Sequence, residues 1–350
     1  MKKALIVSLK FNPGHVSHLV ASYKQCEELE YESTYYVARE FDAYLPDGDR
    51  RIIYGETMPK GFDLAIFLFP SQKNIPVIWE LRRNHKCKIV YVFHEPVVSF
   101  DEYSKAGYTR LQVFIEQLKD FVGCWIVRMA DTVLLPSMKA YNNFQTCERY
   151  KNKNFHYLPL LFDDENNGQD ILERKYFSYI GTLATDHSYD EYQKFVIWAI
   201  KNQQLLNISF MIATKSNVLR TEDIERAILS GRLRIIDGKP MTNSEINLYY
   251  SQSFVIWNAY ERMMQSGVLP KAFMFGTPTI VLKQNESEFV KDGEGVVAIN
   301  NNQSFEEINN AITRVLSSFE HYSKKCRELF FRDFYYRTHN ITFKNIIDKL

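Results

Sequence analysis

The 350-residue sequence has few cysteines, and they form no recognisable pattern. They are odd in number, scattered and without a C-x-x-C pair, and they comprise Cys26, Cys87, Cys124, Cys147 and Cys326. This arrangement excludes a disulfide framework and a cysteine zinc site, and it is typical of reduced thiols in a cytoplasmic compartment. The sequence also has no internal repeat and no low-complexity tract.

Long hydrophobic runs and an excess of charge of one sign are absent as well. Nowhere do about 18 uninterrupted apolar residues occur, which excludes a helix that crosses a bilayer. The N-terminal stretch MKKALIVSLKFNPGH has an apolar segment too short for the core of a signal peptide. The net charge of +1 argues against a chain-wide role in binding nucleic acid. We therefore expect a soluble cytoplasmic protein.

The sequence does contain short β-branched apolar runs that alternate with longer amphipathic stretches. This alternation is typical of βα units around a parallel sheet, and it predicts an α/β protein. The expected strands lie at 3–9, 33–38, 63–69, 88–93 and 131–137 in the first half, and at 176–181, 207–213, 232–238, 253–259 and 277–282 in the second. A strongly periodic stretch at 109–130 predicts a long helix.

A polar segment separates the two alternating series. Residues 164–175, DENNGQDILERK, carry a glycine and lack apolar periodicity, so we expect an interdomain linker there. The predicted domains are 1–165 and 166–330, and a C-terminal helix at about 331–350 is expected to pack back on the first domain.

The stretch QSGVLPKAFMFGTPTIV, from Gln265 to Val281, combines a small-residue loop, a helix start, a glycine stop and a strand. Backbone N–H groups at a helix start lie at the positive end of the helix dipole, and they bind phosphate readily. Gly267 would let a ligand approach the backbone closely. The alternative is an ordinary αβ connection with no ligand.

The order of motifs around this stretch resembles that of GT-B glycosyltransferases, in particular the retaining GT4 group. The matching elements are Gly267-Val-Leu-Pro270, Ala272, Gly276-Thr277-Pro278 and Ile280-Val281, followed by ESEFVKDGEGVVAI downstream. ADTVLLPS at 130–137 and YIGTLATDHSYDEY also stand where that family has related strands. The resemblance implies two Rossmann-like domains that face each other across a cleft, the first for the acceptor and the second for the nucleotide-sugar donor.

Some residues of that family are replaced. Lys271 stands where a glutamate usually binds the ribose, and the other glutamate of the pair would fall at Met263, with Glu261 nearby. Thr182 and His187 replace the arginine and lysine that neutralise the donor diphosphate. Three explanations remain open: other cations bind the donor, the donor is unusual, or the site is inactive. For the first, the candidates are Lys215, Arg220 and Lys271, with a solvent-facing Lys271 as the alternative.

For the donor loop, the resemblance implies contacts from Gln265, Ser266, Gly267 and Val268. In the first domain, Gly14 lies in a strand-to-helix loop that the family uses near the donor phosphates, although a tight turn that needs glycine is almost as good an explanation. His94 and Glu95 follow a buried strand, where ligands collect in open α/β sheets. We expect His94 to contact the transferred sugar and Glu95 to orient it or to contact the acceptor.

The resemblance therefore predicts an enzyme, a glycosyltransferase of the hexosyltransferase kind. It would move a sugar from a nucleoside-diphosphate sugar to a glycan or lipid-linked acceptor in bacterial surface polysaccharide synthesis, with retention, without a metal and without a cofactor. Two alternatives are a non-catalytic subunit that binds a nucleotide sugar or glycan, and a GT-B-like polysaccharide pyruvyl transferase. The stretches 80–88 and 328–337 leave peripheral contact with the inner face of a membrane open.

Overall fold

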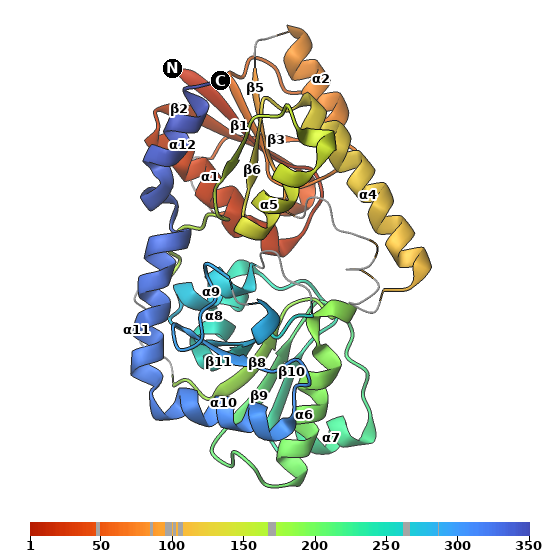
Figure 1. Cartoon of the computed structure of the whole chain (residues 1–350), viewed down its shortest axis with the longest axis vertical. Helices are drawn as coiled ribbons and strands as arrows, with labels where there is room; N and C mark the ends of the chain where they lie inside the picture. Colours follow the sequence, from red (N-terminus) through yellow and green to blue (C-terminus); the bar gives the residue numbers. More distant parts are fainter. Residues whose placement is uncertain are drawn as a thin grey trace. The chain divides into compact units, whose positions relative to one another are not determined.

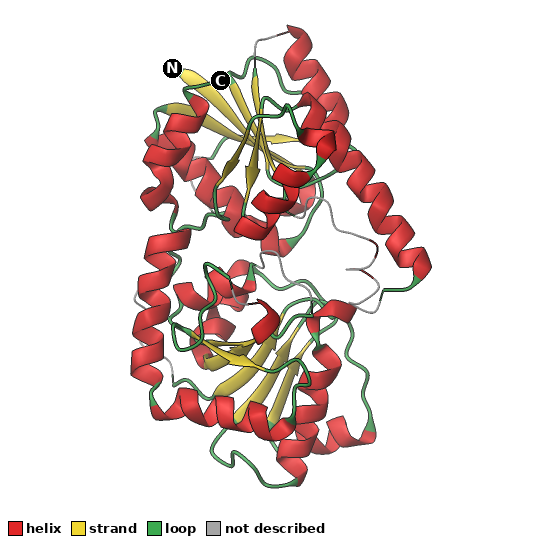
Figure 2. Cartoon of the chain, viewed as in Figure 1, coloured by secondary structure: helices red, strands yellow, loops and turns green. Residues whose placement is uncertain are grey.

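The protein is described here by a computed structural model of the whole chain. It describes residues 1–46, 50–84, 87–94, 100, 103, 108–166, 173–261, 267–285 and 287–350. The chain forms two compact units, one of Met1–Asp163 with Phe334–Leu350 and the other of Asp164–Asp333. In each unit, helices flank a central sheet (Figure 2).

The first unit is built on a parallel sheet whose strands run in the order β3-β2-β1-β4-β5-β6-β7 (Figure 1). Every neighbouring pair is parallel. The strands are β1 (Lys2–Ser8), β2 (Tyr31–Val37), β3 (Ile52–Tyr54), β4 (Leu64–Phe67), β5 (Lys88–Val92), β6 (Thr132–Leu135) and β7 (Phe155–Tyr157).

The helices of this unit connect and cover the strands. They are α1 (Val16–Glu28), α2 (Asn74–Asn84), α4 (Arg110–Met129), α5 (Met138–Thr146) and α12 (Asn340–Ile347), with a 3-10 turn η1 (Pro13–His15) ahead of α1. Helix α4 begins at a capping box. The Thr109 hydroxyl accepts from the backbone N–H of Gln112, and the Gln112 side chain accepts from the backbone N–H of Thr109. This exchange satisfies two of the amide donors that a helix start leaves unpaired.

The second unit repeats the same strand order on a six-stranded parallel sheet, β10-β9-β8-β11-β12-β13. Its strands are β8 (Tyr176–Ile180), β9 (Ser209–Ala213), β10 (Leu233–Ile236), β11 (Ser253–Trp257), β12 (Thr279–Leu282) and β13 (Val296–Ile299). Its helices are α6 (Tyr189–Lys201), α7 (Glu222–Leu229), α8 (Asn243–Gln252), α9 (Val268–Met274), α10 (Phe305–Ser317) and α11 (Phe319–Leu329). Large apolar side chains such as Phe177, Phe210 and Trp257 are buried in its core.

The expected strands are present within one or two residues at each end. The structure adds three short strands that the apolar pattern did not predict, β3, β7 and β13. β3 and β7 have only three residues each, all half-buried, so neither presents a continuous apolar run.

The glycine stop expected at Gly276 is confirmed. Gly276 has a positive φ of 61°, and α9 ends two residues earlier, at Met274. The backbone N–H of Thr277 donates to the carbonyl of Ala272 at 2.9 Å, and that of Gly276 donates to Phe273 at 3.0 Å. These two bonds form a Schellman motif, which satisfies the last carbonyls of the helix and turns the chain into β12.

A side chain at Gly276 should destabilise the protein more than one at another glycine of similar backbone conformation. A Cβ at Gly276 would lie 2.6 Å from Ser323 Oγ and 3.3 Å from the Ser323 carbonyl oxygen. A Cβ at Gly231, whose φ is 73°, would meet nothing within 4 Å. We expect Gly276→Ala to lower the free energy of unfolding by about 3 kcal/mol and Gly231→Ala by about 1 kcal/mol, measured by urea denaturation. Equal losses of unfolding free energy in the two variants would show that the contact with Ser323 of α11 does not destabilise Gly276→Ala.

Candidate functional site

In both sheets, the loops that follow the carboxyl ends of the strands are the candidate binding regions. In an open parallel sheet, ligands bind at this edge, where the strand order reverses and neighbouring loops diverge. The reversal lies between β1 and β4 in the first unit and between β8 and β11 in the second. Each of these two edges is a candidate site in its own unit.

At the edge of the first unit, three aromatic rings form a stack. Phe69, just after β4, stacks on His15 with ring centroids 3.3 Å apart and on His94 with centroids 4.7 Å apart. His15 comes from the turn after β1 and His94 from the end of β5. Phe69 therefore holds two imidazoles from neighbouring strand ends in one row.

His94 is half-buried, and its Nε2 lies 2.7 Å from the carbonyl oxygen of Leu68. A carbonyl only accepts hydrogen bonds, so Nε2 carries the proton and Nδ1 is the acceptor of the neutral ring. Burial lowers the pKa of His94 to about 4, although the bond to the Leu68 carbonyl acts in the opposite direction. The ring is therefore neutral at physiological pH.

Gly14 lies exposed in η1, where its N–H donates to the Asn12 side chain at 3.2 Å. A Cβ at this position would come no closer than 3.7 Å to Asn12, in ordinary contact, and its φ lies outside the left-handed range. The alternative of a turn that requires glycine is therefore wrong. The packing of this unit leaves the choice of glycine unexplained.

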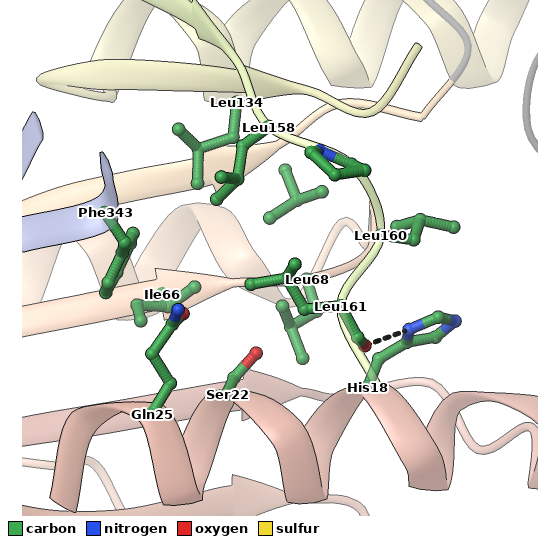
Figure 3. A pocket seen from close by; sticks show the side chains of 12 residues that line it. His18, Ser22, Gln25, Ile66, Leu68, Leu134, Leu158, Leu160, Leu161 and Phe343 are labelled. Carbon is green, nitrogen blue, oxygen red and sulfur yellow. Dashed lines mark hydrogen bonds between the residues drawn. The ribbon is translucent and has the colours of Figure 1, made fainter. Parts of the chain in front are cut away.

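A small cavity lies between α1 and the sheet of the first unit. Figure 3 shows Ser22 and Gln25 on α1 opposite Ile66 and Leu68, and the bond from His18 to the Leu161 carbonyl. Its volume is about 30 Å³, room for one or two waters, whereas ligand pockets have several hundred. This cavity does not have the size of a sugar site.

At the edge of the second unit, a histidine and an aromatic ring also stack. Tyr260, after β11, lies parallel to His187, after β8, with ring centroids 4.0 Å apart. His187 Nδ1 donates to the carbonyl of Thr182 at 2.8 Å. The stack and this hydrogen bond hold the His187 ring between Tyr260 and the Thr182 backbone.

The carboxylate of Glu261 is tied into the same edge. Its Oε1 accepts from Gln303 Nε2 at 3.0 Å and from Ser188 Oγ at 3.4 Å. The Ser188 carbonyl in turn accepts from the indole N–H of buried Trp257 at 3.1 Å. Glu261 is thus held by a hydrogen-bond network that is connected to the core through Trp257.

Two of the predicted cations follow β9. Lys215 is exposed, and it forms no ion pair within the described ranges. Arg220 donates to Asp237 at 2.9 Å and lies 3.9 Å from Glu225. The carboxylates offset much of the charge of Arg220, so Lys215 is the stronger source of positive potential at this edge.

Lys271 lies in α9 and is only 5% exposed, so the solvent-facing alternative is wrong. Its Nζ lies 2.7 Å from Glu165 Oε2 and 3.1 Å from Asn243 Oδ1. Burial lowers the pKa of Lys271, while the Glu165 carboxylate acts to raise it. The ion pair with Glu165 therefore offsets the positive charge of Lys271, which the sequence indicates as a candidate cation for the donor diphosphate.

Several predicted site residues cannot be placed. Glu95, Gln265 and Ser266 lie outside the described residues. Gly267 is the N-cap of α9, with a φ of −67°, and Val268 is its first residue. Within the described ranges no group of three or more histidine, cysteine, aspartate or glutamate side chains could hold a metal ion.

Sequence reasoning missed the rings that organise both edges. Phe69, Tyr260 and His15 are not among the site residues that the sequence predicts. The available signal was position: both aromatics follow the strand next to the reversal of strand order, β4 in one unit and β11 in the other. Recognising it requires the strand order, which a single sequence does not give.

Solved structures resemble the whole chain. A sucrose-phosphate synthase from Thermosynechococcus elongatus superposes with a TM-score of 0.69 and 14% identity, covering 100% of this chain and 99% of that one. HepE from Anabaena, in complex with UDP and glucose, has a TM-score of 0.66 and 12% identity, covering 100% of both chains. An alpha-glucosyltransferase in complex with UDP and a 13-mer DNA containing an HMU base has a TM-score of 0.67 and 12% identity, covering 99% and 98%.

No protein-family model and no curated protein sequence matches the chain. At identities this low, the structural likeness establishes the fold. The chain consists of two Rossmann-like α/β domains in the GT-B fold, as its sequence predicted.

Proposed function

We propose that the protein is a glycosyltransferase that moves a sugar from a uridine-diphosphate sugar to an acceptor. The observation that carries this proposal is the likeness, over the full length of the chain, to glycosyltransferases solved with UDP. The positions of polar and cationic residues at the carboxyl edges of both sheets support it, because this is where open α/β sheets bind ligands.

The second unit is proposed to bind the nucleotide. Lys215 and Arg220, after β9, supply positive charge near the diphosphate, with Lys215 the stronger because it lacks a carboxylate partner among the described residues. Gly267 and Val268, at the start of α9, are proposed to contact the phosphates together with Gln265 and Ser266, which precede them in the sequence. A leaving diphosphate gains negative charge in the transition state, and fixed dipoles and cations stabilise that charge without reorganising.

The first unit is proposed to hold the transferred sugar through His94. The neutral ring offers Nδ1 as an acceptor for a sugar hydroxyl, because Nε2 donates to Leu68. Stacking on Phe69 keeps the ring in place. Gly14, exposed and not required by the turn, is proposed to leave room for the donor phosphates. Glu95 keeps its proposed role of orienting His94 or contacting the acceptor.

The remaining features of the proposal come from the family resemblance. They are GT4-like retention of configuration, transfer without a metal or cofactor, a glycan or lipid-linked acceptor, and a place in bacterial surface polysaccharide synthesis on the cytoplasmic side. Within the described ranges, no helix is long and apolar enough to cross a membrane.

A non-catalytic nucleotide-sugar-binding protein is the second candidate. It is favoured by Lys271, which stands in place of a ribose-binding glutamate and is paired with Glu165. The two candidates differ in turnover. Incubation with UDP-glucose, UDP-galactose and UDP-N-acetylglucosamine should release UDP if the protein is a transferase with some hydrolytic leak, whereas binding without release would support the second candidate.

Loss of His94 should reduce turnover without loss of nucleotide binding. We expect His94→Ala to lower the rate of UDP release by about 100-fold, as for loss of a positioned polar group in catalysis. His94→Gln, which keeps an acceptor, should recover part of this rate. His321→Ala, an exposed histidine on α11, is the matched control. The assignment fails if His94→Ala and His321→Ala are equally active.

Protonation of His94 should destabilise the fold in mild acid. Its pKa is lowered from 6.5 to about 4, so between these values the unfolded chain binds a proton that the folded chain does not. The stabilisation is complete above pH 6.5 and is lost as the pH falls toward 4. From chemical denaturation at a series of pH values, we expect the wild type to lose about 3 kcal/mol more than His94→Gln over this interval. Parallel pH profiles for the two proteins would contradict the lowered pKa of the half-buried ring.

Changes in the second unit should weaken nucleotide binding. We expect Lys215→Met to raise the Kd for UDP about tenfold, through loss of a charged contact. Gly267→Val should raise it by a similar factor by crowding the phosphates, while the φ of −67° at this position accepts a side chain. Lys324→Met, an exposed lysine on α11, is the control. Calorimetry showing wild-type affinity for both variants would leave Gln265–Val281 as an ordinary αβ connection.

A further inference from the structure

Helix α4 of the first unit exposes a continuous row of large apolar side chains. Six of them are between 44% and 69% exposed, and they comprise Leu111, Phe114, Ile115, Leu118, Phe121 and Trp125. Exposed apolar residues elsewhere, such as Leu219, Leu229 and Ile341, lie on separate elements. A contiguous apolar face of this kind marks an interaction surface, whereas single exposed residues are normal.

The row faces away from the core of its unit. Val113 and Val127 are fully buried and lie on the opposite side of the helix. At 3.6 residues per turn, the six exposed residues fall within an arc of about 120°. Helix α4 therefore has two apolar sides: one packs against the protein, and the other is exposed to solvent.

Helix α2 extends the same kind of surface. It packs against α4, and the two helices lie side by side in Figure 1. Trp79 of α2 is 62% exposed. The guanidinium of Arg83 lies 5.8 Å from the Trp79 ring centroid, and that of Arg128 lies 5.7 Å from the ring centroid of Trp125. Each exposed tryptophan thus has an arginine over its ring.

The exposed charged side chains beside the row include three arginines. Arg83, Arg110 and Arg128 are exposed, and none forms an ion pair with a described residue. By contrast, the neighbouring Arg82 is paired with Asp131 at 2.7 Å. At 100° per residue, Arg110 and Arg128 fall on the same flank of the apolar row of α4. The surface therefore combines phenylalanine, leucine and tryptophan with cations along one border.

We propose that the outer face of α4, together with Trp79 and Arg83 of α2, binds the surface of a membrane that contains anionic phospholipids. Apolar side chains would enter the boundary between headgroups and acyl chains, tryptophans prefer this level, and arginines attract anionic headgroups. In this proposal α4 lies in the plane of the membrane surface, with its apolar row toward the acyl chains. The surface does not include His94 or the residues proposed to bind the nucleotide, and its test does not require transfer activity.

A second copy of the chain is a less favourable occupant of this face. In a symmetric dimer, the same patch of both subunits meets itself, so unpaired arginines would approach one another across the interface. A lipid surface of opposite charge has no such repulsion. Charge complementarity therefore selects the anionic bilayer.

The test is co-sedimentation of the full-length protein with vesicles of phosphatidylcholine, with and without phosphatidylglycerol. We expect binding to the anionic vesicles that weakens with salt. Phe114→Ser with Phe121→Ser should lower the partition coefficient at least tenfold, through loss of apolar burial. Arg128→Gln should lower it about fivefold. Quenching of tryptophan fluorescence by brominated lipids should accompany binding, and it should be weaker in Trp125→Phe.

Leu229→Ser and Ile341→Ser are the controls, because these residues are more exposed than any in the row but stand alone. All the substituted side chains are at the surface, and circular dichroism verifies that the variants remain folded. The proposal is overturned if the wild type does not bind anionic vesicles, or if the controls weaken binding as much as the α4 variants. It is also overturned if light scattering shows a dimer that the two serines dissociate and vesicle binding is absent.

Discussion

Parallel strand pairing is the constraint on which the rest of this structure depends. Each pair of neighbouring strands in both sheets is parallel, so each connection must cross from one end of the sheet to the other. The crossovers cover both faces of each sheet with helices, and central strands such as β5 and β11 are accordingly apolar and buried. Polar functional side chains therefore lie at the strand ends, where the reversal of strand order separates neighbouring loops.

The two units use the same fold but place different chemistry at this edge. In the first unit, Phe69 orders two imidazoles, and burial keeps His94 neutral. In the second, Glu261 is held by Gln303 and Ser188, and cations follow β9. One edge is suited to neutral hydroxyl groups and the other to an anion. This division agrees with the acceptor and donor roles proposed for the two domains.

Lys271 illustrates how a buried charge is accommodated. This buried lysine binds Glu165, which lies at the start of the second unit. A buried ammonium without a partner would cost several kcal/mol, so the two residues must be considered together. The same carboxylate also accepts from Asn247 at 2.8 Å. The pair therefore links the start of the second unit to α8 and α9, and it stabilises the packing of these elements.

The sequence by itself determined the α/β class, most of the strands with continuous apolar runs and the glycine stop at Gly276, after α9. These features depend on local chemistry: β-branched runs, helical periodicity and the ease with which glycine adopts a positive φ. Only the tertiary structure decided which side of α4 meets the core, because periodicity shows that a stripe is apolar but not what covers it. It also decided the stack of His15, Phe69 and His94, and the pairing of Lys271 with Glu165, which lie 106 positions apart. Such contacts are set by the order in which strands join a sheet, and that order is a property of long-range packing, which no local pattern encodes.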